Sequence, residues 1–350
     1  MSHFDALANR AHTCYVLVIA YQSLFWVLHR RLSSSNARVS FSTVVAAVVL
    51  VLGGCAPVTG GALSPDTTFG NPEPVTLQGY TGPQEDPTLS PDGTILFFDS
   101  HNDAEKPTYQ YWAKKIDYKT FAFQGEIQGA NKQGETTFAA TMDESGNLYL
   151  DTSLFTAPVL ATARGTFKNG TVIGAGPVKG LPTSPALPWG PNRIIDVYFG
   201  EITFDGNSLY LDDFQVKTDP SGHPANPVGG KFKLFTKNQD GSFREAANSD
   251  NILERVNALS PGKILYGAVQ SKDGLELFFT GSDVPSPSAK KVGLYVAKRG
   301  STNEPFGTPE EIGTPSSHVE APFPSPDGKH LYFHELISAS ESQLYVETRQ

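Results

Sequence analysis

Residues 86–99 read DPTLSPDGTILFFD: a short apolar strand, a polar turn and an aromatic-rich strand in succession. The Asp92-Gly93 pair suits the positive φ angles of a tight hairpin turn. The same plan recurs four times, as TFAATMDESGNLYLD (137–151), YFGEITFDGNSLYLD (198–212), YGAVQSKDGLELFFT (266–280) and EAPFPSPDGKHLYFH (320–334). The turn glycines are 53, 60, 68 and 54 residues apart. One hairpin used five times predicts a repeat architecture.

Further strands complete each repeat. A third strand is expected at 109–116, 159–167, 231–236, 293–297 and 343–348, and a fourth at 125–128, 176–179, 243–246 and 309–312. The chain stops after the third strand of the last repeat, and residues 73–79 can supply the missing fourth one. We therefore predict an all-β, five-bladed β-propeller over residues 73–350, closed by an N-terminal strand, because closure removes unpaired sheet edges. Segments 180–192 and 218–230 are expected to be loops.

The composition agrees with this plan and excludes some functions. The 33 Gly and 26 Pro show no three-residue period, which is typical of many turns between strands. A net charge of −9 would repel a phosphate backbone, so no nucleic acid is expected as a partner. Two cysteines, Cys14 and Cys55, can form neither a disulfide framework nor a Cys-rich zinc site.

An apolar run at residues 43–52 has the length of a signal-peptide core and is too short to span a bilayer. It ends in Leu52-Gly53-Gly54-Cys55, which resembles the lipobox of bacterial lipoproteins. The resemblance implies that Cys55 is diacylated on sulfur and becomes the N-terminus after cleavage. Ala56 in place of Asp implies the outer membrane of a Gram-negative cell. The alternative is a buried apolar strand that contains an ordinary cysteine.

The expected organisation has three parts. Residues 1–54 form a leader, of which residues 1–31 are untranslated if translation starts at Leu32 or Val39. Residues 55–72, rich in Gly, Pro, Thr and Ser, form a flexible tether, and residues 73–350 form the propeller. The predicted location is the bacterial cell envelope, on the periplasmic face of the outer membrane, with the membrane as a partner through the lipid anchor.

The turns at residues 90–93 and 325–328 both read Ser-Pro-Asp-Gly and are followed by Ile-Leu-Phe-Phe or Leu-Tyr-Phe. These segments resemble the WD-repeat-like propeller repeat of TolB-type periplasmic proteins. Repeats two to four lack the Ser-Pro pair and diverge from it. The resemblance implies the fold strongly and the function weakly, because propellers carry many activities.

Two positions of the repeat are candidates for a site at the propeller axis. Eight residues before the turn glycine stand Glu85, Phe138, Tyr198, Tyr266 and Glu320; five or six residues after it stand Asp99, Asp151, Asp212, Thr280 and His334. If these side chains converge, they could bind hydroxyl groups or a cation such as calcium. Alternatively, each one ties the backbone of its own blade.

The residues predicted to bind a ligand are Glu85, Asp99, Asp151, Asp212 and His334. No cofactor is expected, and the histidines lack metal-ligand spacing, so no metal site is assigned.

Two segments, Asp86-Pro87 and Glu320-Ala321-Pro322, resemble those around the acids of arabinanase-like five-bladed glycoside hydrolases. That likeness implies Glu320 as acid and Asp86 as base, with Asp196 or Glu201 as a third group. Inversion would need carboxyls ~6.5–9.5 Å apart. Since both segments run directly into the Ser-Pro-Asp-Gly turn, the TolB-type repeat explains them without catalysis. We predict a binding or scaffolding propeller with an envelope protein or a glycan as partner, and a glycan-acting enzyme as the alternative.

Overall fold

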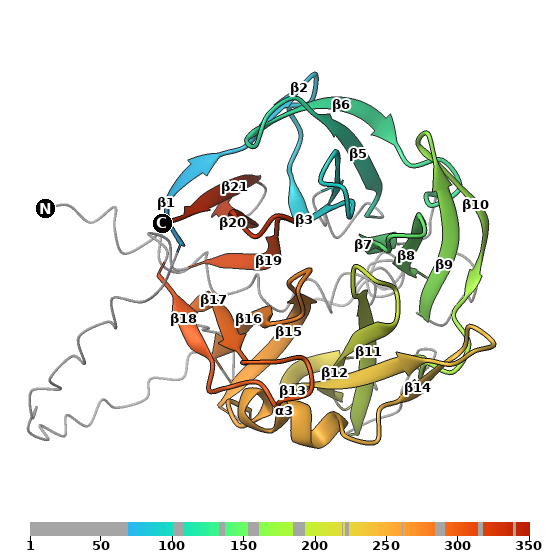
Figure 1. Ribbon diagram of the computed structural model, residues 1–350, viewed down its shortest axis with the longest axis vertical. Helices are drawn as coiled ribbons and strands as arrows, with labels where there is room; N and C mark the ends of the chain where they lie inside the picture. Colours follow the sequence, from blue (N-terminus) through green and yellow to red (C-terminus); the bar gives the residue numbers. More distant parts are fainter. Residues whose placement is uncertain are drawn as a thin grey trace, which may run out of the picture.

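The computed structural model describes residues 69–350, except 101–107, 133–136, 153–160, 185–192, 219, 221–223, 261, 284–290, 314–317 and 339–340. The expected leader, Cys55 and all but the last four residues of the expected tether lie outside the described residues. Five β-sheets stand around one axis (Figure 1), which confirms the five-bladed propeller. Within the described ranges, no helix has the length and hydropathy needed to cross a membrane.

Apart from the two N-terminal strands described below, the strands of each blade are antiparallel and follow chain order from the axis to the rim. Blade 1 contains β3 (Glu85–Leu89), β4 (Ile95–Asp99), β5 (Gln110–Lys115) and β6 (Thr120–Glu126); blade 2 contains β7 (Thr137–Met142), β8 (Asn147–Thr152), β9 (Ala161–Lys168) and β10 (Thr171–Pro177). Blade 3 contains β11 (Ile194–Ile202), β12 (Ser208–Thr218), β13 (Pro224–Lys237) and β14 (Phe243–Glu245); blade 4 contains β15 (Lys263–Gln270), β16 (Glu276–Asp283), β17 (Val292–Lys298) and β18 (Glu310–Ile312). Blade 5 contains β19 (Val319–Pro324), β20 (His330–Ser338) and β21 (Glu341–Arg349).

The N-terminal segment closes the ring, as predicted. Strand β1 (Phe69–Pro74) pairs with β21 as the fourth strand of blade 5. It begins four residues before the expected start at Glu73. Strand β2 (Thr76–Gln78) does not continue in blade 5, because it pairs in parallel with β6 as a fifth strand of blade 1. The expected strand at 73–79 is therefore divided between two blades, and it links the last blade to the first.

The hairpin turns owe their shape to a repeated hydroxyl–aspartate pair. In blade 1 the Ser90 hydroxyl donates to Asp92 Oδ1 at 2.6 Å, and Gly93 takes a φ of 70°. The same contact recurs at Thr203–Asp205, Ser271–Asp273 and Ser325–Asp327, at 2.6–2.7 Å. Because an L-residue side chain is strained at such a φ, glycine ends each turn.

Two outer strands lie earlier in the chain than predicted. The fourth strands of blades 1 and 2 are β6 and β10, whereas the expected positions were 125–128 and 176–179. In blade 2 the reason is the turn Asn169-Gly170, with φ angles of 49° and 83°, which reverses the chain directly after β9. A tight turn leaves no room for a connection between the strands that the sequence indicates at 159–167 and 176–179.

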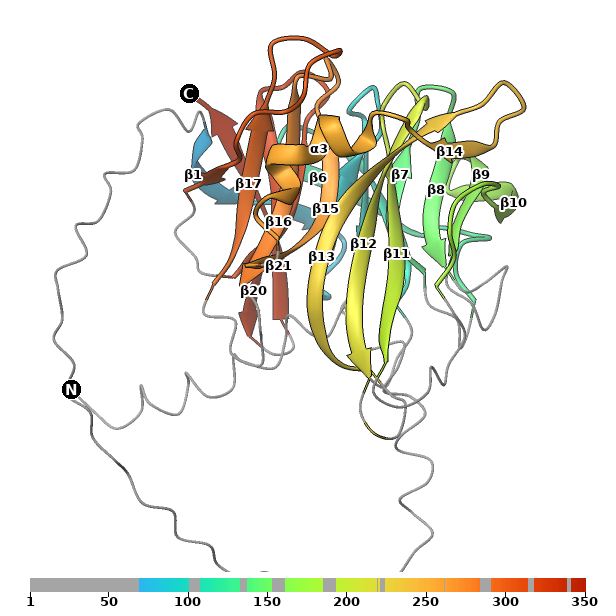
Figure 2. The ribbon, with the colours of Figure 1, turned by 90° about the horizontal axis from the view of Figure 1, so that it is seen from below.

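Blade 3 departs most from the expected pattern. Strands β12 and β13 form a long hairpin that projects from one face of the disc (Figure 2), so residues 224–230, expected in a loop, belong to β13. The unpredicted helix α3 (Ser249–Asn257) joins blades 3 and 4. It buries Ile252, Leu253 and Val256 against the core. Because polar residues surround these three apolar ones in the sequence, the short apolar stripe of the helix is hard to recognise there.

The core lies between neighbouring blades. Aromatic residues of the second strands, among them Phe97, Phe98, Tyr149, Tyr210, Phe278 and Tyr332, are almost fully buried there. Each apolar side chain of this size stabilises the fold by roughly 1.5–3 kcal/mol. Successive side chains of a strand point to opposite faces of the sheet. An apolar run such as Ile-Leu-Phe-Phe therefore places large rings on both faces of a blade, where they pack against the two neighbouring blades.

Candidate functional site

A hydrogen bond of one kind recurs between each blade and the next around the axis, which gives five such bonds in the ring. In every blade one side chain of the second strand accepts a hydrogen bond from a backbone N–H in the first strand of the following blade. The pairs are Asp99 Oδ2 with Ala139 (3.3 Å), Asp151 Oδ2 with Gly200 (2.9 Å), Asp212 Oδ2 with Gly267 (2.8 Å), Thr280 Oγ1 with Ala321 (2.9 Å) and His334 Nδ1 with Asp86 (3.2 Å). We call these five contacts the blade latches.

In four of the five blades the donor N–H faces the preceding blade because the first strand is bulged. Asp86, Ala139, Gly267 and Ala321 all have φ angles between 48° and 63°, and the strand register shifts beside each of them. A bulge turns one peptide out of the ladder and redirects its N–H. Blade 3 keeps a continuous register, and its donor Gly200 stands six residues before the turn glycine rather than seven.

The latches explain the polar column that was predicted to bind a ligand. Asp99, Asp151, Asp212 and His334 are at most 3% exposed, and each contributes an atom to the next blade. The alternative that such residues tie their own blade is wrong in one respect, because the backbone N–H belongs to the neighbouring blade. These residues hold the ring together whether or not any of them also contacts a ligand.

Burial raises the pKa values of the aspartate side chains that form three of the latches. Desolvation raises the pKa of Asp151 to about 7, although the Gly200 N–H and the Thr162 hydroxyl oppose the shift. It also raises the pKa of Asp212 and of Asp99 well above the usual value, and the neighbouring Asp86 adds to the effect at Asp99. A buried carboxyl is favoured in its neutral form unless a cation pairs with it.

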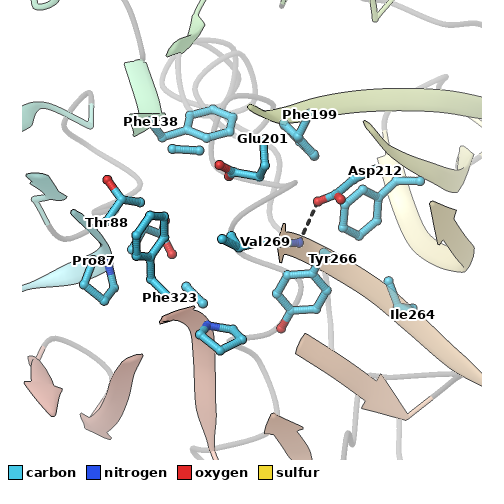
Figure 3. Close-up of a pocket in the computed structure, with 16 residues that line it drawn as sticks. Pro87, Thr88, Phe138, Phe199, Glu201, Asp212, Ile264, Tyr266, Val269 and Phe323 are labelled. Atoms are coloured by element: carbon cyan, nitrogen blue, oxygen red, sulfur yellow. Dashed lines mark hydrogen bonds between the residues drawn. The ribbon is translucent and has the colours of Figure 1, made fainter. Parts of the chain in front are cut away.

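A cavity of about 80 Å³ lies at the axis between the blades (Figure 3). Most of its lining is apolar, and the aromatic members are Phe138, Phe199, Phe214, Tyr266 and Phe323. The polar groups that reach it are Asp86, Thr88, Glu201, Asp212 and Tyr266. An apolar pocket with a few convergent polar groups is the usual form of a small-molecule site.

Glu201 is the central acid of this cavity. Its side chain extends from β11 towards the middle of the pocket in Figure 3, and the residue is 8% exposed. Its Oε2 atom has no hydrogen-bond partner among the described residues, and neither does Asp212 Oδ1. Burial raises the pKa of Glu201 well above its usual value, and Asp151, Asp212 and Asp86 raise it further while Thr141 opposes them.

The proposed acid–base pair, Glu320 and Asp86, has an imidazole next to both carboxyls. His334 Nδ1 lies 3.6 Å from Asp86 Oδ1, and His334 Nε2 lies 4.0 Å from Glu320 Oε2. Since Nδ1 accepts the Asp86 N–H, a ring that holds a single proton carries it on Nε2, on the side of Glu320. Glu320 is 1% exposed and is bonded to His318 at 2.9 Å. The two acids are therefore connected by a packed ring rather than by open space.

The pKa values do not suit the roles that the resemblance implied. Burial raises the pKa of Glu320, but the His318 hydrogen bond and the charges of His318 and His334 outweigh it, so the pKa is lowered. Burial raises the pKa of Asp86 to about 6 against the influence of His334. A glycosidase acid needs the higher pKa and its base the lower one. Here the order is reversed.

The remaining candidates lie apart from the cavity lining. Asp196 lies near the end of the β11–β12 hairpin that is farther from the connecting turn, where Gln215 Nε2 donates a hydrogen bond to Asp196 Oδ1 at 3.3 Å. Glu85 is buried opposite Asp99 in the β3–β4 ladder. Among the described residues, no group of three or more His, Cys, Asp or Glu side chains is arranged to hold a metal ion.

A third position of the repeat also contributes to the cavity, and it was not predicted from the sequence. Five residues before the turn glycine stand Thr88, Thr141, Glu201, Val269 and Phe323, and all but Thr141 line the cavity. The single charged residue in this column was the available signal. The sequence predicts Glu201 only as an alternative third catalytic group.

Comparison with known proteins supports the architecture. No family model and no curated protein sequence matches the chain. A solved glycoside hydrolase aligns over 81% of this chain and 92% of its own, with 10% identity and a TM-score of 0.51. TolB from Acinetobacter baumannii aligns over 77% and 55%, with 11% identity and a TM-score of 0.38. The catalytic domain of the Coprinopsis cinerea GH62 alpha-L-arabinofuranosidase aligns over 79% and 95%, with 10% identity and a TM-score of 0.45. At these identities the likeness concerns the fold alone.

Proposed function

We propose that this protein is a binding propeller of the bacterial cell envelope and that the axial cavity is its ligand site. The observation that carries the proposal is the Glu201 carboxyl, which is buried in an aromatic cavity with one oxygen that lacks a partner among the described residues. Leaving a buried acceptor unpaired costs ~1–3 kcal/mol, so a fold retains such a group at a cost that a ligand could offset.

Binding can be tested by filling the cavity. Val269 lies at its centre in Figure 3, so Val269→Phe should occupy the space, whereas Val269→Ile adds one carbon and serves as the matched control. A chemically diverse panel of small molecules is screened by the shift in Tm of the wild-type protein. We expect at least one compound to stabilise the wild type and the Ile variant but not the Phe variant. Equal stabilisation of the Phe variant would place the ligand elsewhere.

A glycan-acting enzyme is the second candidate, because Asp86 and Glu201 both reach the cavity. It predicts sugar release from a glycan panel that disappears in Glu320→Gln or Asp86→Asn and persists in Asp196→Asn. We expect no release above the protein-free blank from any of these proteins. Release that depends on Glu320 would contradict the binding function and establish catalysis.

The envelope location depends on Cys55, which precedes the described residues. We expect Cys55→Ser to prevent lipid attachment, and the protein should move from the membrane fraction to the soluble fraction or accumulate with its leader uncleaved. Fractionation followed by intact-mass measurement checks this, with Cys14→Ser as the matched control. A membrane-bound wild-type protein with an unmodified N-terminus upstream of residue 55 would exclude the anchor.

A further inference from the structure

We propose that the axial cavity binds the ammonium group of a small organic cation, with Glu201 and Asp212 as its hydrogen-bond acceptors and the surrounding rings as its apolar wall. This inference rests on the proposed binding function and specifies the ligand class. It is carried by three features of the cavity: its charge, its aromatic lining and its size.

The cavity is lined by acids, and its own described lining supplies no basic residue to pair with them. Asp86, Glu201 and Asp212 reach the cavity, and none of the described residues that line it is Lys, Arg or His. Asp212 is 3% exposed, and its Oδ1 atom has no hydrogen-bond partner among the described residues, like Glu201 Oε2. A ligand anion would be repelled by these acids, whereas a cation would pair with them.

The aromatic lining favours a cation over a neutral polar ligand. Phe138, Phe199, Phe214 and Tyr266 form a continuous series with ring centroids 5.2, 5.4 and 5.8 Å apart. Ring faces attract ammonium groups, and the attraction is strongest in sites that exclude water. A sugar would instead need several hydrogen-bonding groups around its ring, and most of this lining has none to offer.

The size of the cavity limits the ligand to a small group. Its volume is about 80 Å³, compared with ~150 Å³ for an apolar cavity that accepts benzene. A primary ammonium on a short alkyl chain fits this limit. The three N–H donors of a primary ammonium can reach two carboxyl oxygens at once, which a quaternary ammonium cannot do.

Binding should be linked to proton release. The groups that face Glu201 are Asp86, Asp151 and Asp212, together with the Thr141 hydroxyl, and the acids and burial raise the Glu201 pKa. Without a bound cation, burial and the neighbouring acids therefore favour the neutral form of Glu201, and an ammonium must displace that proton. Because an alkylammonium keeps its own proton to about pH 10, as lysine does, its affinity should increase as the pH rises.

The test uses propylammonium and its neutral analogue 1-propanol, titrated calorimetrically into the full protein. At pH 8 we expect propylammonium to bind with a Kd on the order of 1 mM and 1-propanol to bind at least about tenfold more weakly. The propylammonium affinity should fall about tenfold or more between pH 8 and pH 5.5.

Variants assign the effect to the proposed acceptors. Glu201→Gln should weaken propylammonium binding at least about tenfold, and Asp196→Asn, on the same strand but outside the cavity lining, should leave it unchanged. Asp212→Asn is a second variant that can keep the latch to Gly267 through its amide oxygen, and it should also weaken binding.

The outcomes separate this inference from the proposed function. Equal affinity for propylammonium and 1-propanol, or full affinity in Glu201→Gln, would overturn the ammonium site. If a neutral ligand then binds in a manner that Val269→Phe abolishes, the binding function stands without it. If no compound binds the wild type in a cavity-dependent way, both proposals fail.

Discussion

Removal of residues 69–74 is expected to destabilise the protein by at least ~3 kcal/mol and to promote self-association. Phe69 is 6% exposed, stacks edge-on against Phe278 at 5.9 Å, and lies beneath the Arg349 guanidinium at 4.4 Å. Losing a buried phenylalanine side chain costs ~3–5 kcal/mol. The deletion also strips β21 of its outer partner, and an unpaired strand edge is a template for association with another chain.

The effect should exceed that of a simple edge deletion because β1 also contacts blade 1. Glu73 accepts a hydrogen bond from the Tyr118 hydroxyl at 2.5 Å and pairs with Lys119. Urea unfolding and light scattering measure both consequences. Phe69→Ala should reproduce most of the loss of stability without the association, and Ile194→Ala, at a position 61% exposed, is the control expected to stay within ~0.5 kcal/mol. An unchanged urea midpoint after the deletion would mean that the ring closes without β1.

The propeller could be predicted from the sequence because its determinants are local. The turn that ends in glycine and the aromatic-rich strand after it lie within about fifteen residues and recur five times, and four of the five turns are Asp-Gly pairs with a hydroxyl residue two positions before the aspartate. The outer strands depend instead on pairing between segments, so their ends were placed less well. In blade 2, for example, β10 begins directly after the Asn169-Gly170 turn, earlier than the segment 176–179 that the sequence indicates.

The site could be predicted only in part, because the role of each residue depends on contacts with a neighbouring blade. Asp151 looks like an axial ligand group in the sequence, and only the adjacent first strand shows that its carboxyl accepts the Gly200 N–H. The bulges that present the donors in the other four blades leave no signature in the sequence, since Asp86, Ala139 and Ala321 are not glycines. The apolar rings of Phe214 and Phe323 line the cavity but lie outside the two repeat positions that the sequence indicates as site candidates.

The blade latches should contribute measurably to stability, and Asp151 offers the sharpest test. Its Oδ2 accepts the Gly200 N–H at 2.9 Å and its Oδ1 accepts the Thr162 hydroxyl at 2.7 Å, in a residue without solvent exposure. Asp151→Ala leaves both donors without this acceptor and should cost ~2–4 kcal/mol at pH 5 in urea unfolding. Asp151→Asn is isosteric, can accept from Gly200 and donate to Thr162, and should retain wild-type stability at that pH to within ~1 kcal/mol.

The two proteins should diverge as the pH rises, in the direction that the raised pKa dictates. The folded pKa of Asp151 is about 7, whereas the unfolded value is about 3.9, so the unfolded chain loses this proton first. The wild type is therefore most stable below pH 4 with respect to this group, and it loses up to ~1.4 kcal/mol per pH unit until about pH 7, where the folded carboxyl ionises as well. Asp151→Asn has no proton to lose, so its stability relative to the wild type should increase across this interval and level off above pH 7. A constant difference from pH 5 to pH 8 would mean that Asp151 is already ionised in the folded protein, and the latch would then be a charge-assisted bond rather than a neutral one.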